Sequence, residues 1–420
     1  MTHVAPPGGT VKVKVNPDAA GFDGGRLARI DEHLRTRYLE PGKIAGCQVV
    51  VARSDQIAHC SSLGLMDRER ARPVLDDTIW RLYSMTKPIT GAALLTLYER
   101  GLFQLNDPVD RFLPEFRDMQ VIERLDDGTK RLVDPERPIS VRDAMMHMTG
   151  IGYGPPEARL DMANVAGGKP ARGLGKGATL ETLVAALAGE PLRFHPGTHW
   201  LYSWSTDVCA RLVEVISGER FDHYLQATIL DPLDMVDTAF FVPEEKAERL
   251  AALYTRDSNK QLTLLDDPET SRSLRMPSLL LGGGGLLGTT ADYLRLCQML
   301  VNGGQLGETR VLGRKTIELM SANHLPGGGT LRDFAFRGGY GEVGFDGMGF
   351  GLTVAVSDGP VATAAEGSRG EYMWGGAAST LFWIDPVEEL VVIFMTQLIP
   401  SGSFNFRGQL KALVYSAIAH

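Results

Sequence analysis

One stretch of sequence restricts the possible fold more than any other. Residues 84–102 carry alanine and leucine on nearly every face of the helix that they predict, and the stretch ends at Gly101. A helix that is apolar all round is typical of a protein interior. Pro88 fits only the first turn of a helix, so this helix must begin close to Ser84. The chain therefore has to enclose the helix between two layers.

Both ends of the chain carry strand patterns flanked by amphipathic helices. The predicted strands are residues 45–52, 57–65, 350–356, 379–384 and 390–397, of which the first two form a hairpin. The predicted helices are residues 24–39 and 406–418. This pattern predicts one antiparallel sheet built from both chain ends.

The middle of the chain has a different character. Between about residue 115 and residue 281, loops rich in proline and glycine separate short helical patterns. The loops are residues 150–156 and 167–177, and the helical patterns are residues 180–187 and 206–216. The region indicates a helical insertion in the sheet domain.

These patterns predict an α+β protein with two domains. A chain of 420 residues is long for a single hydrophobic core. We expect residues 1–114 and 285–420 to form a domain around the antiparallel sheet, with helices on its flanks. Residues 115–284 would form the inserted, mainly helical domain, and the active site would lie in the cleft between the two.

Charge and hydropathy exclude several classes of partner. The formal net charge is −8, and no run of lysine or arginine occurs, so we expect neither nucleic acid nor a membrane as a partner. Residues 1–22 lack the apolar core of a secretory signal, and nowhere is there an uninterrupted apolar run of about 18 residues. We therefore expect a cytoplasmic protein, either a monomer or a small homo-oligomer.

The four cysteines are scattered and form no CxxC pair. Cys47 and Cys60 would face one another across the predicted hairpin if they were bonded. The favoured alternative is that these two, with Cys209 and Cys297, are small buried hydrophobic residues.

The segment Ser84-Met85-Thr86-Lys87 places a serine and a lysine one helical turn apart on the same face. A serine hydroxyl is a poor nucleophile until a base takes its proton, and a neutral lysine amine is such a base. The apolar helix supplies the burial that lowers a lysine pKa, and its dipole favours a developing oxyanion at Ser84. Taken alone, the short pattern favours a capping serine and a surface lysine.

Two further segments supply the other groups of an acyl-transfer site. Tyr202 lies on a loop that enters a helix, where its phenol can carry a proton between nucleophile and leaving group. Trp374-Gly375-Gly376-Ala377 precedes a predicted strand, and its glycines allow close approach of the backbone to a ligand. The amides of Ser84 and Ala377 would then form an oxyanion hole. In isolation, a packed aromatic ring and a tight glycine bend are the simpler interpretations.

The order of these segments resembles the serine β-lactamase and penicillin-binding-protein superfamily, in particular the class C β-lactamases and the family VIII carboxylesterases. The resemblance covers most of the chain and implies a β-lactamase-like fold. It also implies an acyl-enzyme on Ser84, with Lys87 and Tyr202 as general base and acid, and an oxyanion held by the amides of Ser84 and Ala377. The matching segments are residues 82–87, 98–101, 105–109, 139–150, 194–197, 202–203, 282–285, 290–293 and 374–376.

Two departures from the lactam-hydrolysing relatives indicate the substrate. Those relatives carry Lys-Thr-Gly where this chain has Trp374-Gly375-Gly376, so an anionic substrate loses its lysine partner. Their tyrosine motif ends in asparagine, where Trp204 stands here. Trp-Gly-Gly is similar to the esterase branch, so we expect a serine carboxylesterase acting on short-acyl esters. Residues expected to bind the substrate are Tyr153, Trp204, Trp374, Gly375 and Gly376.

Three alternatives share parts of this interpretation. A β-lactamase or an acyltransferase of the same superfamily would use the same catalytic residues. A catalytically silent penicillin-recognising domain would lack a member of the set Ser84, Lys87 and Tyr202, and all three are present.

Two other motifs match ligand-binding patterns, but their sequence context argues against binding. Gly283-x-Gly285-x-x-Gly288 matches a dinucleotide fingerprint, but no βαβ unit surrounds it, and a glycine turn at the edge of the cleft is favoured. His195 and His199 are separated by Pro196-Gly197, which prevents a helical metal-binding face. We therefore expect no metal and no cofactor. His147 is expected to hold a loop through hydrogen bonds.

Overall fold

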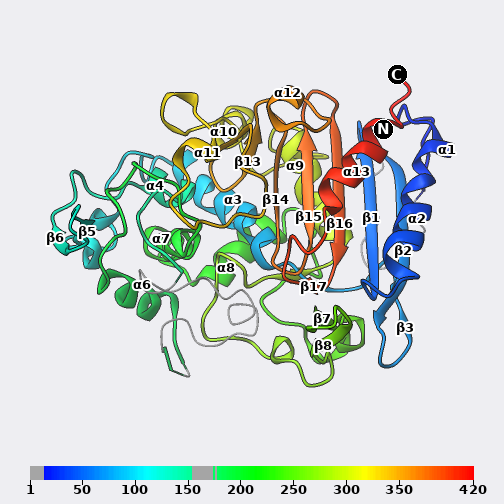
Figure 1. The fold of residues 1–420 in the computed structure, drawn as a ribbon, viewed down its shortest axis with the longest axis horizontal. Coiled ribbons are helices and arrows are strands. Elements are labelled where there is room, and N and C mark those ends of the chain that lie inside the picture. Colours follow the sequence, from blue (N-terminus) through cyan, green and yellow to red (C-terminus); the bar gives the residue numbers. More distant parts are fainter. Residues whose placement is uncertain (1–13, 154–173, 176) are drawn as a thin grey trace.

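The computed structural model describes residues 14–153, 174–175 and 177–420. Its centre is an eight-stranded sheet with strand order β12-β13-β14-β15-β16-β1-β2-β3, in which every pairing is antiparallel (Figure 1). The strands come from both chain ends, which confirms the predicted α+β class and sheet. Their bounds are β1 Gly46–Arg53, β2 Gln56–Asp67, β3 Arg72–Pro73, β12 Met348–Phe350, β13 Ala355–Ser357, β14 Tyr372–Gly375, β15 Leu381–Asp385 and β16 Leu390–Thr396.

Helices cover both faces of this sheet (Figure 1). On one face, Phe394 of β16 packs against Phe406 of helix α13, Phe406–Tyr415, with ring centroids 4.8 Å apart. On the other, Phe382 of β15 meets Tyr293 of helix α9, Thr290–Val301, at 5.2 Å. Adjacent positions of a strand point to opposite faces, so the almost wholly apolar β15 and β16 are buried on both sides. Helices α1, Gly24–Leu27, and α2, Arg29–Leu34, pack beside α13.

The apolar helix lies in the interior, as predicted. It is α3, Thr86–Glu99, and eleven of its fourteen residues are buried. A short 3-10 turn, Tyr83–Met85, precedes it, and Pro88 occupies its third position. Helix α7, Ser205–Ser217, packs along α3. A Cβ atom on Gly91 would overlap the Thr353 side chain, so the helix approaches its neighbours too closely for a larger residue there.

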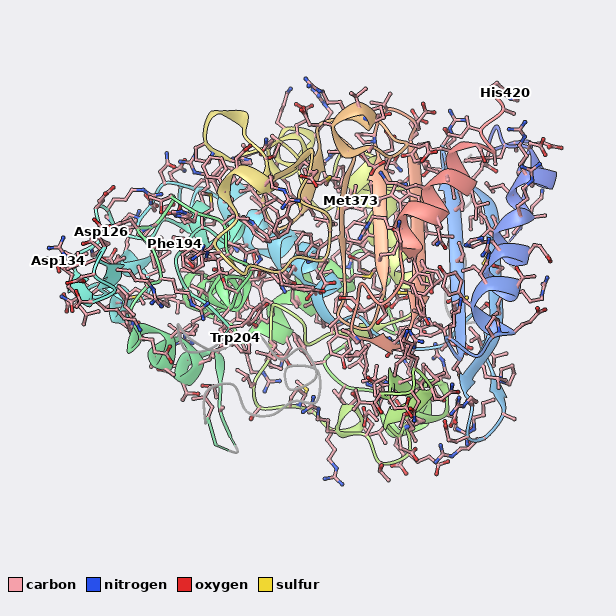
Figure 2. All side chains as sticks on the ribbon, viewed as in Figure 1. Asp126, Asp134, Phe194, Trp204, Met373 and His420 are labelled. Atoms are coloured by element: carbon pink, nitrogen blue, oxygen red, sulfur yellow. The ribbon has the colours of Figure 1, made fainter. Side chains whose placement is uncertain are left out.

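The region between the two sheet segments contains short helices and two small hairpins. The helices are α4 Val141–Met146, α6 Leu180–Ala188, α7 and α8 Phe221–Leu225. The hairpins, β5–β6 (Val121–Arg124, Lys130–Val133) and β7–β8 (Leu253–Arg256, Leu262–Asp266), were not predicted. Figure 2 shows Asp126 and Asp134 of the first hairpin at the end of the molecule farthest from the sheet. The domain limits stay a prediction, and the predicted loops 150–156 and 167–177 lie partly outside the described residues.

The remaining elements are short. They are β4 Trp80–Arg81 paired with β9 Leu287–Gly288, β10 Gln305–Leu306 paired with β11 Thr309–Arg310, β17 Leu398–Ile399, α10 Arg314–Met320, α11 Leu331–Phe334 and α12 Pro360–Thr363. No described helix combines the length and the apolar character needed to cross a membrane.

Three sequence expectations about local structure were wrong or incomplete. The predicted strand 350–356 is two antiparallel strands, β12 and β13, joined by a turn in which Thr353 has φ 72°. Its turn residues are as buried as its strand residues, so the apolar pattern did not reveal the reversal. Strand β14 lies where the sequence predicts no strand, because Gly375 and Gly376 favour a bend. The predicted helix 24–39 is interrupted at Ala28 and ends in a π-helical turn, Arg35–Leu39.

The hairpin register keeps the cysteines apart. Cys60 lies opposite Val50, and Cys47 lies opposite Leu63. All four cysteines are free thiols. Cys47, Cys209 and Cys297 are buried, as the favoured interpretation expected, whereas Cys60 is partly exposed.

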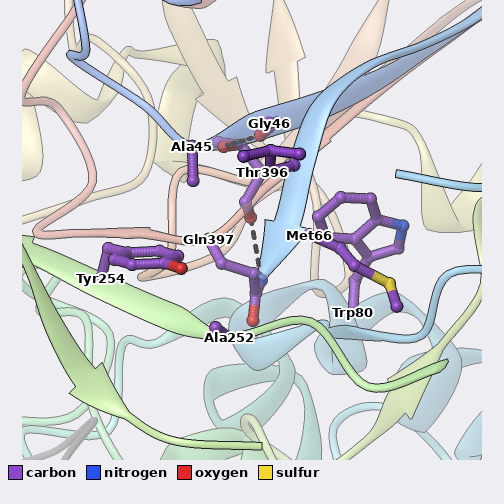
Figure 3. A pocket seen from close by; sticks show the side chains of 9 residues that line it. Ala45, Gly46, Met66, Trp80, Ala252, Tyr254, Thr396 and Gln397 are labelled. Atoms are coloured by element: carbon purple, nitrogen blue, oxygen red, sulfur yellow. Dashed lines mark hydrogen bonds between the residues drawn. The ribbon is translucent and has the colours of Figure 1, made fainter. Parts of the chain in front are cut away.

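A small cavity lies where β1, β2 and β4 meet β7 (Figure 3). Its polar groups are already bonded, since Thr396 Oγ1 donates a 2.8 Å hydrogen bond to the carbonyl oxygen of Gly46. It has room for about one water molecule. None of the predicted site residues lines it, so it belongs to the packing of the sheet end.

Candidate active site

Ser84 stands in the 3-10 turn that leads into α3, and its side chain is nearly buried. The preceding residue, Tyr83, has φ 46°, a conformation that costs a non-glycine residue about 1–3 kcal/mol and is concentrated at functional sites. One helical turn further on, Lys87 Nζ donates a 3.2 Å hydrogen bond to Ser84 Oγ. The structure therefore brings together the serine and lysine of the predicted motif.

Lys87 is completely buried. Its ammonium group donates a 2.6 Å hydrogen bond to the carbonyl oxygen of Gly283 and a 3.4 Å bond to Tyr153 Oη. Burial lowers the pKa of Lys87 to about 8, although the carboxylates of Asp207 and Glu342 act in the opposite direction. A lysine in this setting is readily converted to a free amine, which is the form that a general base requires.

Tyr202 also contacts Lys87, whose Nζ is 4.5 Å from the centroid of the phenol ring. The indole Nε1 of Trp374 donates a 3.3 Å hydrogen bond to Tyr202 Oη. Burial raises the pKa of Tyr202 well above its usual range, while hydrogen bonds with Ser84 and Trp374 lower it. The neutral phenol is therefore placed to relay a proton among these side chains.

His147 supports the loop that carries Tyr202. Its backbone carbonyl accepts a 2.9 Å hydrogen bond from the amide of Leu201, and its Nδ1 lies 3.5 Å from Ser203 Oγ. Burial lowers the pKa of His147 well below its usual range, so the ring is neutral. The ring packs edge-on against Tyr202 at 4.9 Å between centroids. These contacts are those of a loop support.

Gly376, directly after β14, lets two turns meet beside Ser84. A Cβ atom on Gly376 would overlap the carbonyl oxygen of Leu82, two residues before Ser84. The next residue, Ala377, is buried. Its backbone amide donates a hydrogen bond to no acceptor among the described residues. An unpaired amide beside the nucleophile suits an oxyanion donor. Arg407 fixes the strand end by donating a 2.9 Å hydrogen bond to the Trp374 carbonyl.

Two of the expected substrate-binding aromatic residues pack together. The rings of Tyr153 and Trp204 lie 5.0 Å apart between centroids, and Trp204 is buried. Tyr153 also reaches Lys87, so its hydroxyl has a second contact that the sequence interpretation did not assign. Trp374 is fully buried, and its ring packs against the phenol ring of Tyr202.

Three residues near Lys87 were missed in the sequence interpretation. Asp207 and Gly283 are joined by a 2.9 Å hydrogen bond from the Gly283 amide to Asp207 Oδ1. Glu342 comes from the segment between α11 and β12, and its Oε2 accepts a 3.0 Å hydrogen bond from Tyr340. The glycine run 282–285 was a usable signal for the turn. Nothing in the local sequence marks Glu342, because it approaches the site only through the fold.

His195 and His199 contact different partners. His195 Nε2 lies 3.5 Å from Glu123 Oε1, whereas His199 Nδ1 lies 3.0 Å from Thr198 Oγ1. Across the described part of the chain, His, Cys, Asp and Glu nowhere gather in a group of three or more that could hold a metal ion.

Comparison with known proteins gives consistent matches along most of the chain. The family model described as Beta-lactamase matches residues 32–416. Esterase EstB of Burkholderia gladioli is 30% identical over 406 residues, which cover 92% of this chain and 95% of that protein.

Solved structures agree with the sequence matches. EstCE1, described as a hydrolase with promiscuous acyltransferase activity, superposes with a TM-score of 0.75 at 25% identity, covering 94% of this chain and 99% of that one. A family VIII carboxylesterase superposes with a TM-score of 0.68 at 18% identity, covering 93% and 96% of the two chains, which is a likeness of fold alone.

Proposed function

This chain belongs to the beta-lactamase family and is a serine hydrolase, and from that premise we propose that it hydrolyses short-acyl carboxylic esters through an acyl-enzyme on Ser84. The observation that carries the proposal is the contact of Ser84 Oγ with Lys87 Nζ at 3.2 Å inside a buried site. A buried amine with a lowered pKa removes a serine proton far more readily than a solvated lysine does.

The reaction follows from the positions of the polar groups. Lys87 and Tyr202 act as a coupled pair that takes the Ser84 proton, and Ser84 Oγ forms a bond to the ester carbonyl carbon. The amides of Ser84 and Ala377 stabilise the oxyanion of the tetrahedral intermediate. When the bond from that carbon to the alkoxy oxygen breaks, the pair returns the proton to the leaving alcohol. Water then attacks the acyl-enzyme by the same route and releases the carboxylic acid.

The charges around Lys87 favour an uncharged substrate. Trp374 is neutral where lactam-hydrolysing relatives carry lysine, and Glu342 adds an acidic group that interacts with Lys87. Tyr153 and Trp204 add an apolar wall. A β-lactam carboxylate would find no cationic partner at position 374, so a neutral ester is the better substrate.

An acyltransferase is the second candidate. EstCE1 is described as having promiscuous acyltransferase activity, and the two reactions differ only in whether water or another nucleophile accepts the acyl group. We propose that the partner is a small-molecule ester in either case and that no cofactor takes part.

The experiment compares hydrolysis of p-nitrophenyl butyrate and nitrocefin by the wild type, Ser84→Ala and a control, Ser416→Ala. Ser416 is an exposed serine at the end of α13. Its replacement controls for the loss of a serine hydroxyl outside the candidate active site. We expect rapid ester cleavage that is lost only in Ser84→Ala, with little nitrocefin turnover.

Each other outcome contradicts a different part of the proposal. Rapid nitrocefin turnover would show that Trp374 does not exclude lactams. Covalent labelling of Ser84 by a fluorophosphonate without hydrolysis would identify an acyltransferase, to be confirmed by adding an alcohol acceptor. Absence of both labelling and hydrolysis would indicate a silent domain.

A further inference from the structure

We propose that Asp207 is a positioning residue of this site: its carboxylate fixes the Gly283 peptide, whose carbonyl holds Lys87 against Ser84, and its negative charge acts on that lysine. This inference rests on the proposed function, because it assigns a role to Asp207 in the use of Lys87 as a base. Asp207 itself contacts neither Ser84 nor Tyr202 through a hydrogen bond among the described residues.

A single peptide unit connects Asp207 to Lys87. Asp207 lies in the first turn of α7 and is 1% exposed. The amide of Gly283 donates a 2.9 Å hydrogen bond to Asp207 Oδ1, and the carbonyl of the same residue accepts a 2.6 Å hydrogen bond from Lys87 Nζ. Because the glycine uses both of its backbone groups in this way, any movement of the carboxylate moves the acceptor that orients the lysine.

The turn that contains Gly283 is held between two helices. The hydroxyl of Thr90, on α3, donates a 2.7 Å hydrogen bond to the carbonyl of Gly282. A Cβ atom on Gly282 would lie 2.5 Å from Cβ of Ala210 on α7, and one on Gly283 would lie 2.6 Å from Asp207 Oδ2. Glycine is therefore required at both positions by close approach. The glycine run that mimics a dinucleotide fingerprint has this structural use instead.

The charges of Asp207 and Lys87 also act on one another. Burial raises the pKa of Asp207 to about 6, while the charge of Lys87 opposes that change. In return, Asp207 and Glu342 both raise the pKa of Lys87 against the effect of its burial.

The other titratable groups that face Lys87 are neutral. Burial raises the pKa values of Tyr153 and Tyr202 well above their usual range, and it lowers that of His147 well below. Among the described residues, Asp207 and Glu342 are therefore the two carboxyl groups that act on the charge of Lys87, and burial raises the pKa of Glu342 as well.

The test measures kcat/KM for p-nitrophenyl butyrate as a function of pH in the wild type and in Asp207→Asn. Asparagine keeps an oxygen that accepts from the Gly283 amide and removes only the charge. Because the protonated lysine loses an anionic neighbour, the acidic limb of the profile should move to lower pH by about one unit. Asp207→Ala, which also releases the peptide, should lower kcat at least about tenfold with little change in KM.

Asp292→Asn is the matched control. Asp292 is also buried in the first turn of a helix, α9, burial raises its pKa to about 6, and it accepts a 2.8 Å hydrogen bond from Thr238. Lys87 is not among the groups that shift its pKa. We expect Asp292→Asn to lower stability and to leave the acidic limb in place. An equal shift in both variants would overturn the assignment to Asp207.

A second variant keeps the test decisive if Asp207→Asn does not fold. Thr90→Val releases the glycine turn from α3 without altering any charge, so it should reduce kcat severalfold with an unchanged acidic limb. Wild-type kcat in this variant would contradict the positioning role.

If wild-type enzyme itself fails to cleave the ester, the proposed function fails. If it cleaves the ester and Asp207→Asn keeps the wild-type profile, only the present inference fails.

Discussion

The indole nitrogen of Trp374 donates a 3.3 Å hydrogen bond to the phenol oxygen of Tyr202, and the two rings lie 5.3 Å apart between centroids. Trp374, which stands where the family resemblance predicts a lysine in lactam-hydrolysing relatives, therefore contacts the predicted proton carrier directly. A neutral donor at this position orients the phenol without adding a positive charge beside it.

Trp374→Phe tests this contact. The substitution keeps an aromatic ring and removes the N–H donor, so we expect kcat/KM for p-nitrophenyl butyrate to fall about three- to tenfold, mainly through kcat. The control is Trp383→Phe on the neighbouring strand β15, since Trp383 is equally buried and its Nε1 has no hydrogen-bond partner among the described residues. Equal losses in the two variants would mean that packing, and not the hydrogen bond, explains the effect.

The pH dependence of the reaction should report Lys87. Burial lowers its pKa to about 8, and only the neutral amine accepts a proton. We expect kcat/KM to rise with pH up to about 8 and to level off above it. A pH-stat assay avoids interference from the absorbance of the product. A limb centred about two units lower would assign the base to another group.

Lys87 should also reduce the stability of the folded protein. Lowering its pKa from 10.5 to about 8 corresponds to roughly 3 kcal/mol of unfavourable burial of the charged form. Lys87→Met removes this charge but leaves the Gly283 carbonyl without its donor, so we expect a net gain of about 1–2 kcal/mol near neutral pH.

The sign of the pH effect provides the check on Lys87→Met. The cost of burying the charged lysine is complete below pH 8, where the folded and unfolded states are both protonated, and it disappears as pH rises from about 8 to 10.5. Urea denaturation should therefore show that the advantage of the methionine variant shrinks over this range. A constant difference between the two proteins would argue against a strongly perturbed lysine.

Tyr153 has two separable contacts. Tyr153→Phe removes the hydroxyl that lies 3.4 Å from Lys87 Nζ and keeps the ring beside Trp204, so kcat should fall severalfold while KM stays unchanged. Tyr153→Ala also removes the ring and should raise KM. If both variants raise KM equally and leave kcat unchanged, Tyr153 serves only as a wall of the substrate pocket.

Much of the fold follows from local patterns in the sequence. The all-round apolar character of residues 84–102 predicts a buried helix, and Pro88 predicts its start. Alternating and continuous apolar runs predict β1, β2, β15 and β16 within a few residues, because burial of one or both strand faces leaves a direct record in composition.

The elements that the sequence did not predict correctly lack a distinctive apolar pattern. Residues 350–356 form a hairpin whose turn is buried by its neighbours, and apolar composition does not distinguish a buried turn from a buried strand. Strand β14 contains a glycine at its end, which resembles a turn in sequence. The short hairpins β5–β6 and β7–β8 carry mostly exposed or partly exposed side chains, so no strong apolar alternation marks them.

The sequence by itself determined that the candidate nucleophile and the candidate base meet, because Ser84 and Lys87 are one helical turn apart and local geometry brings them together. The tertiary structure decided how those groups are tuned. Asp207, Gly283 and Glu342 reach Lys87 from segments more than a hundred residues away in the chain, and no pattern of local spacing records such contacts. The pKa of a buried lysine depends on the desolvation and the charges that the whole fold assembles around it, so the lysine's readiness to act as a base is a property of the tertiary structure.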